Sequence, residues 1–385
     1  MAAQEPPKRT PEQEKQVARA REILEEARKA TFALPVEEEG RATLLQGIAG
    51  AYAEAGDVDS ALLTVDALGE GYSQFKGNIL TIIAVHQARA GDVDGALRTF
   101  DSAEDQGWKS FGMLMVVVRL GRQGYWGPAR QLADKIEEEE VRGKALVLLA
   151  QGQAARGDAT GARLTAEAIP DEAQREKTLR NIERMEPLIA AGGKVETIDT
   201  AFPAATLGSP RVRPETAPFQ LQLPSTGLLV AGDNSADPVV NRVRELVEAA
   251  VEVKDEAAKK AAIEQLQHAA ELAASIESPC DRADQLYLVA VAQSELGDFQ
   301  RARKTTAQLT GQRGGGGLGS LIHLYTVRSV ASAQAASGGV DDSLAWAESD
   351  ANPTLRAAVL LGAAEGILRR LEVEKWPANL PKPPQ

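Results

Sequence analysis

A glycine that ends a helical pattern recurs along the chain, in its first half about every 34 residues, and such a period indicates a repeat fold. The copies are Gly56, Gly91, Gly124, Gly157, Gly297 and Gly338. Apolar or small residues stand 11, 8, 7 and 3 positions before each glycine. These offsets lie on one face of an α-helix, so each copy predicts a helix that ends at its glycine.

The residues around each glycine predict a helix hairpin. Glycine takes a left-handed C-cap without a steric penalty, and the Asp that usually follows it caps the next helix. A small residue five positions after the glycine allows the second helix, helix B, to pack on the first, helix A. One hairpin cannot bury its own apolar face, so stacked hairpins are expected to form an all-α solenoid. The residues given structural roles in this pattern are Arg41, Gly56, Asp57, Ala61, Lys76, Gly91, Asp92, Ala96, Arg142, Gly157, Asp158, Ala162, Arg282, Gly297, Asp298 and Ala302.

A basic residue recurs fifteen positions before the glycine, one turn ahead of the apolar stripe. The residues at this position are Arg41, Lys76, Lys109, Arg142 and Arg282. We expect each to lay its aliphatic stem over the seam between repeats and to pair with an acid on a neighbouring helix. A basic stripe that binds an acidic ligand remains the alternative.

The pattern resembles the tetratricopeptide repeat, over about residues 41–169 and again over about 282–347, in its period, its Gly-Asp turn and its Ala early in helix B. The large residue early in helix A is Leu or Met here, most closing prolines are missing, and the family's Tyr survives only as Tyr52. The resemblance implies a right-handed superhelix whose A helices line a concave, protein-binding groove. Lys and Asn do not occur together at the inward positions, which argues against a chaperone-type carboxylate clamp. The expected groove residues are Gln46, Asn78, Thr81, Val85, Leu114, Val118, Val147, Tyr287 and Val291.

Composition shifts predict the organisation of the chain. We expect a disordered N-terminus (1–10), a helical repeat block (11–190), a Pro/Gly-rich linker (191–237), a second helical block (238–373) and a Pro-rich tail (374–385). A Gly-rich loop at 311–319 interrupts the second block. Prolines and glycines without a helical period are typical of linkers and loops.

Charge and apolar content exclude several classes of partner. The 385 residues include 43 Lys+Arg and 55 Asp+Glu, which gives a net charge of −12 at pH 7. A protein that coats nucleic acid or anionic lipid needs a basic face, so neither partner is expected. No apolar run reaches the roughly 18 residues of a membrane span. Aromatic residues make up only 4%, so the core is expected to consist mainly of Ala, Leu and Val.

Motifs that carry chemistry are weak. Residues 314–319 satisfy a GxGxxG spelling, but no strand precedes them, so a mobile loop is favoured over a nucleotide site. Asp-x-Asp pairs such as Asp57 and Asp59 lack the ligand number of a calcium loop, and capping explains them. The three histidines lie far apart in the sequence, and Cys280 has no evident His base. We therefore predict no catalytic residue, no metal and no cofactor.

The sequence predicts a non-catalytic scaffold that binds a peptide or helix of an unidentified protein partner. Two alternatives stay open: a self-assembling structural or coat-like component, which would form homo-oligomers, and a regulatory subunit or enzyme with a ligand site at the Gly-rich loop. No signal peptide precedes the first helix, which favours the cytoplasm. A periplasmic or secreted location stays open if a cleaved signal peptide is missing from the sequence.

Overall fold

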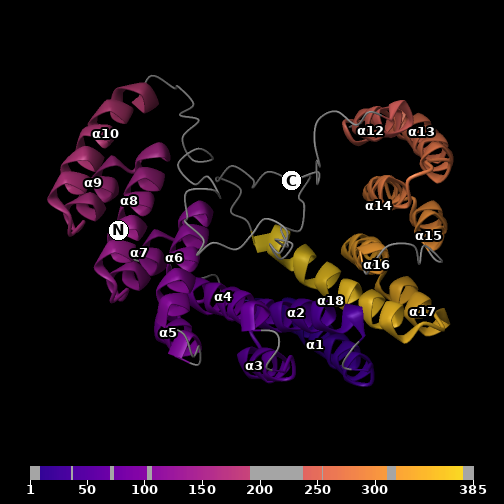
Figure 1. The fold of residues 1–385 in the computed structure, drawn as a ribbon, viewed down its shortest axis with the longest axis horizontal. Coiled ribbons are helices and arrows are strands. Elements are labelled where there is room, and N and C mark those ends of the chain that lie inside the picture. The colour runs from indigo at the N-terminus through magenta and orange to yellow at the C-terminus, as the bar shows by residue number, and fades with distance from the viewer. Residues whose placement is uncertain are drawn as a thin grey trace. The chain divides into compact units, whose positions relative to one another are not determined.

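The computed structural model describes residues 9–35, 38–69, 73–101, 106–190, 237–253, 255–309 and 318–375. Within these ranges the chain is all-helical, with seventeen helices and no strand (Figure 1). Except for their edge residues, the expected linker, Gly-rich loop, tail and N-terminus lie outside the described ranges. Thr10, which we expected to be disordered, instead caps the first helix by accepting a hydrogen bond from the Gln13 backbone N–H at 3.2 Å.

The helices form two compact units. Unit 1 contains α4 (Ser73–Arg89), α5 (Val93–Asp101), α6 (Gln106–Gln123), α7 (Trp126–Asp134), α8 (Glu139–Ala155), α9 (Ala159–Glu167) and α10 (Glu172–Ala190). Unit 2 contains α1 (Pro11–Phe32), α2 (Glu39–Ala55), α3 (Val58–Asp66), α12 (Pro238–Val251), α13 (Glu256–Ala274), α14 (Pro279–Glu295), α15 (Phe299–Ala307), α16 (Leu318–Ala336), α17 (Val340–Ser349) and α18 (Pro353–Lys375).

This division differs from the expected blocks 11–190 and 238–373. The first three helices belong with the last seven, because α1 and α2 pack against α18. The Pro/Gly-rich stretch marks a change in composition, but the first compact unit begins only at Gly69. The amino-acid composition indicates where the helices end. The boundaries of the compact units depend instead on which apolar helix faces pack together.

The turns inside the hairpins follow the glycine pattern. All six pattern glycines have a positive φ, from 80° at Gly56 to 104° at Gly338. The Asp57 carboxylate then accepts the backbone N–H of Ser60 at 3.1 Å, and Asp298 accepts that of Arg301 at 3.2 Å. Each cap satisfies a donor that the first turn of a helix leaves without an intrahelical partner.

A buried Gln–Thr hydrogen bond joins helix A to helix B in both units. The Thr165 hydroxyl donates to the Gln153 side-chain oxygen at 2.7 Å, and Thr305 donates to Gln293 at 2.8 Å. Each pair spans twelve residues across the Gly-Asp turn. The glycine pattern does not predict this contact, although Gln recurs four positions before the glycine.

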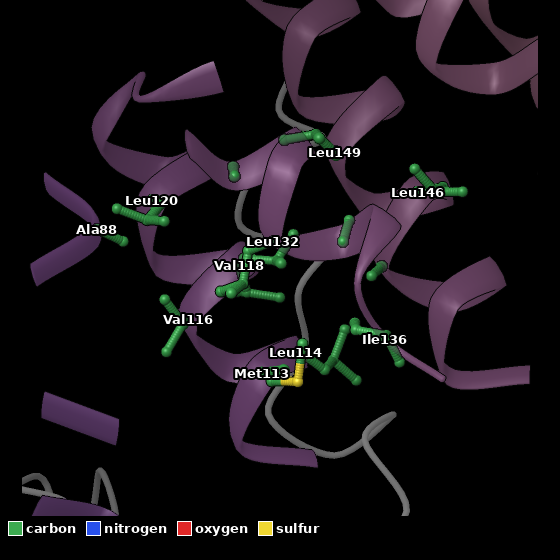
Figure 2. Close-up of a cluster of buried hydrophobic side chains, with 14 of the residues drawn as sticks. Ala88, Met113, Leu114, Val116, Val118, Leu120, Leu132, Ile136, Leu146 and Leu149 are labelled. Carbon is green, nitrogen blue, oxygen red and sulfur yellow. The ribbon is translucent and has the colours of Figure 1, made fainter. Parts of the chain in front are cut away.

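The core of unit 1 is a continuous cluster of Ala, Leu, Val and Ile from α4 to α10. Figure 2 shows Leu114 and Val118 of α6 inside this cluster, together with Leu132 and Ile136. Large aromatic side chains contribute little to it, apart from Phe100. Stacking of small residues lets neighbouring helices approach closely, as the sequence pattern predicts.

In unit 2 the two ends of the chain build one hairpin between them. Helix α18, drawn in yellow, packs along α16 and along the indigo helix α1 (Figure 1). It also packs against α17 and α2, so α18 takes the place of a helix A and α1 takes the place of its helix B. The apolar stripe of α1, which includes Val17, Ile23 and Leu24, is buried.

Polar contacts fix α1 against the C-terminal helices. The Arg370 guanidinium of α18 donates to the Gln16 side-chain oxygen at 3.0 Å. Arg19 pairs with Asp341 of α17 at 2.5 Å. The composite hairpin therefore joins side chains that lie more than 300 residues apart in the sequence.

Helix α18 is buried on all sides over residues 357–368. Gly362 and Gly366 permit this, since a Cβ at either position would overlap a backbone carbonyl of α16. The only charged side chain within this buried stretch, Glu365, forms a bidentate ion pair with Arg328 of α16. A helix that is apolar on every face is typical of the centre of a bundle.

Candidate functional site

Two A helices, α8 in unit 1 and α14 in unit 2, each keep one stripe of side chains accessible. In α14 the stripe consists of Asp284, Tyr287, Val291 and Glu295, at spacings of 3, 4 and 4 residues. The same four positions of α8 are Lys144, Val147, Gln151 and Ala155. All eight residues are exposed or half-buried, whereas most other positions on these helices are buried. This stripe is the candidate binding surface of each unit.

The expected groove residues divide into two groups. Five of them are half-buried and open to a ligand, namely Asn78, Thr81, Val147, Tyr287 and Val291. The other four are buried and offer almost no area, namely Gln46, Val85, Leu114 and Val118. Thr81 also satisfies its hydroxyl locally, by donating to the Gly77 carbonyl at 2.9 Å.

The buried members are covered by other helices of their own unit. Val85, Leu114 and Val118 belong to the apolar cluster of unit 1, and Figure 2 labels the latter two within it. Gln46 lies on α2, whose helix A face is closed by α16 and α18. The Arg328 guanidinium reaches this face, because a Cβ at Gly47 would lie 2.9 Å from one of its nitrogens.

The accessible face of α14 carries two carboxylates with unusual electrostatics. The protein around Asp284 raises the pKa of its carboxyl, and the like charge of Asp281 adds to the rise, while Arg244 opposes it. Loss of hydration beside the protein likewise raises the pKa of the exposed Glu295, against the opposing charge of Arg369. Between the two carboxylates, Tyr287 forms a side-chain hydrogen bond with Ser329 of α16.

In unit 1 the corresponding charges are positive. Helices α4 and α6 contain no Asp or Glu at all. The Arg89 guanidinium lies 5.5 Å from the centre of the Tyr125 ring, and Arg156 lies 5.9 Å from the Trp126 ring. Arg156 also donates to the Arg122 carbonyl. Stacking on an aromatic ring holds a guanidinium in place over the ring face.

The positive charges near His86 of α4 affect the pKa of its imidazole. Burial lowers the pKa of His86 to about 3, and the charges of Arg89 and Arg119 lower it further. The imidazole is therefore neutral at physiological pH. The sequence shows His86 only as an isolated histidine, because Arg119 belongs to α6, in the next repeat.

The recurring basic position caps backbone carbonyls. Arg142 donates to the Ile136 carbonyl at 3.1 Å, and Arg282 donates to Ile276 at 2.9 Å. Lys109 instead pairs with Asp101 of α5 at 2.6 Å, which is the contact expected with an acid on a neighbouring helix. A further member, Arg175, was missed by the glycine pattern and donates to the Ile169 carbonyl at 3.0 Å.

Other candidate chemistry is sparse in the part of the chain that the structure describes. No group of three or more His, Cys, Asp or Glu side chains within these ranges could hold a metal ion. Cys280 is exposed in the first turn of α14. A shallow hollow of about 360 Å³ is lined by Asp92, Asp94, Asp134 and Lys135, among others, at the edge of α5 and α7.

None of the helices within the described ranges is long and apolar enough to cross a bilayer. Comparison of the chain with known protein families, curated proteins and solved structures finds no match. The architecture is all-helical, with many helix-to-helix contacts, and is compatible with a helical repeat fold.

Proposed function

We propose that the chain is a non-catalytic scaffold of the helical-repeat class, which binds a peptide or helix of another protein along its accessible helix A faces. The hairpins are taken to follow the tetratricopeptide-like, right-handed arrangement, with helix A on the concave side. The glycine turn, the small residue early in helix B and the period of the repeat support this geometry.

One observation carries the proposal. Helices α8 and α14 belong to different units, yet each keeps the same four positions accessible. A helix face that serves only stability is normally buried against a neighbouring helix. Single exposed side chains are common on protein surfaces and do not indicate a binding site. A stripe that recurs at fixed positions offers a row of contacts for an extended or helical ligand.

Site-specific photo-crosslinking tests the proposal. A photoreactive phenylalanine analogue replaces Val147 or Val291 in the full chain, which is then irradiated in a lysate of the cells that make it. Matched controls place the same group at Leu63 or Leu164, which are 59% and 60% exposed and lie on the B helices α3 and α9. The products are identified by mass spectrometry.

We expect one polypeptide to be attached at Val147 or Val291 and not at the two control sites. Substitution of a neighbouring stripe residue, Gln151→Lys or Tyr287→Ala, should reduce its yield several-fold. Equal labelling at helix B, or labelling of a second copy of the chain alone, would contradict the proposal. The second result would instead favour the self-assembling alternative.

A further inference from the structure

We propose that the accessible face of α14 binds a positively charged segment of a partner protein, with two basic side chains that flank apolar residues. This inference rests on the proposed function, since it names the partner chemistry of one helix A face. All the residues concerned belong to unit 2.

Geometry supplies the first step. Asp284 and Glu295 are eleven residues apart on one face of α14, so they lie about 16 Å apart along an axis that rises about 1.5 Å per residue. The half-buried Tyr287 and Val291 lie between them. An extended peptide covers this distance in about five residues, at roughly 3.3 Å each. A Lys or Arg at either end of such a segment would reach both carboxylates while its middle packs on Tyr287 and Val291.

Electrostatics supplies the second step. Within the described residues, the structure gives neither Asp284 nor Glu295 a hydrogen bond or an ion pair. Both side chains are exposed, yet the protein close to each disfavours the charged form and raises the two pKa values. A carboxylate in this condition gains more from an incoming cation than a fully hydrated one does.

The charged neighbours of the face are few. Arg244 of α12 acts on Asp284, Arg369 of α18 acts on Glu295, and Asp281 adds a further negative charge beside Asp284. The two arginines moderate the negative potential at its ends without forming an ion pair with either carboxylate. An acidic segment would meet three carboxylates on α14 and is disfavoured there.

Selection from a displayed library of random twelve-residue peptides tests this assignment, with the purified full chain as target. Enriched peptides are synthesised, and their dissociation constants are measured by fluorescence anisotropy at two salt concentrations. The test variant is Asp284→Asn with Glu295→Gln. The control variant, Glu248→Gln with Glu348→Gln, makes the same change in net charge at exposed positions of α12 and α17.

We expect enriched peptides to carry two Lys or Arg residues about five positions apart, as the helical rise of α14 requires. Their affinity should fall about tenfold or more in the test variant and less than twofold in the control, and should weaken with added salt. Circular dichroism establishes that both variants are folded. Replacement of the two basic residues by Gln should weaken binding to the wild-type chain to a similar degree.

Three results would overturn the inference, and they differ in what they say of the proposed function. Enrichment of acidic or uncharged peptides on α14, or equal affinity for wild type and test variant, would refute the basic character assigned to the bound segment. The proposed scaffold function would still stand. Peptides that depend on Val147 but not on Asp284 would leave the scaffold proposal standing and refute the α14 site. Failure to enrich any peptide that depends on a helix A face would count against both.

Discussion

The two units use the same hairpin but assemble it from different parts of the chain. Unit 1 stacks consecutive helices from α4 to α10, so each hairpin packs on its neighbours in sequence. Unit 2 instead completes its array with α1, which serves as helix B for α18 at the other end of the chain. The repeat pattern thus specifies the hairpin. The closing contact, which is the packing of α1 on α18, depends instead on which apolar helix face is left without a partner.

The accessible faces of the two units also differ in charge. Helices α4 and α6 of unit 1 carry no acidic residue, and arginines stack on aromatic rings at their C-terminal ends. Helix α14 of unit 2 carries carboxylates at both ends of its stripe. A protein with a net charge of −12 therefore distributes its charges unevenly between equivalent positions. Two units with one fold can in this way recognise ligands of different charge.

The largest effect is expected from removal of α1. Deletion of residues 1–32 leaves α18 without its helix B and exposes the surface that Val17, Ile23 and Leu24 cover. Burial of three such side chains contributes about 5 kcal/mol, which is comparable to the whole stability of many domains. Hydrogen exchange should show loss of protection in α16 to α18 and little change in α6 to α9. Unchanged protection of α18 would show that the composite hairpin does not stabilise unit 2.

The next effect concerns the buried ion pair between Arg328 and Glu365 in unit 2. Glu365→Ala leaves the Arg328 charge buried without its partner and should cost about 3–5 kcal/mol. The double variant Arg328→Met with Glu365→Leu removes both charges and should recover most of that loss. Urea unfolding of the single and double variants measures the difference. A single variant as stable as the double would mean that the pair is not desolvated.

Local features of both units were predictable from the sequence, whereas the closing contact was not. The positive φ of Gly56 and the Asp57 cap follow from residues within one turn, so a single sequence contains the information. The pairing of α1 with α18 depends on complementary faces more than 300 residues apart, which no local period reports. The burial of Val85 and Leu114 was missed for the same reason. They occupy ligand-facing positions in the pattern, and neighbouring helices of unit 1 cover them.

A smaller effect tests whether the shared hairpin contact contributes equally in both units. Thr165→Val in unit 1 and Thr305→Val in unit 2 keep the side-chain shape and remove the hydroxyl that bonds a buried Gln. Each should cost about 1–3 kcal/mol, because the Gln oxygen loses its partner. Hydrogen exchange would follow each unit separately. The matched variants Gln153→Leu with Thr165→Val, and Gln293→Leu with Thr305→Val, should recover part of the loss. A cost confined to one unit would show that the contact is not equivalent in the two.

The smallest effect is a difference between the two units in how their stability depends on pH. His86 in unit 1 has a pKa lowered to about 3, against 6.5 in the unfolded chain. Between these values the unfolded state binds the proton and the folded state does not, so the stability of unit 1 falls as pH falls below about 6.5.

For Asp284 and Glu295 in unit 2 the sign is reversed. Their raised pKa values mean that the folded state holds the proton longer, so their contribution to stability is lost as pH rises through the folded pKa. In His86→Gln, the loss of stability of unit 1 at pH 5 should be about 1 kcal/mol smaller than in the wild type. The full pKa shift of His86 would give a larger difference, but the side chain is half-buried and water screens its charge. Asp284→Asn with Glu295→Gln should change unit 2 in the opposite sense, and hydrogen exchange measured from pH 4 to pH 7 would follow both. Equal slopes in wild type and His86→Gln would mean that the imidazole is as hydrated in unit 1 as in the unfolded chain.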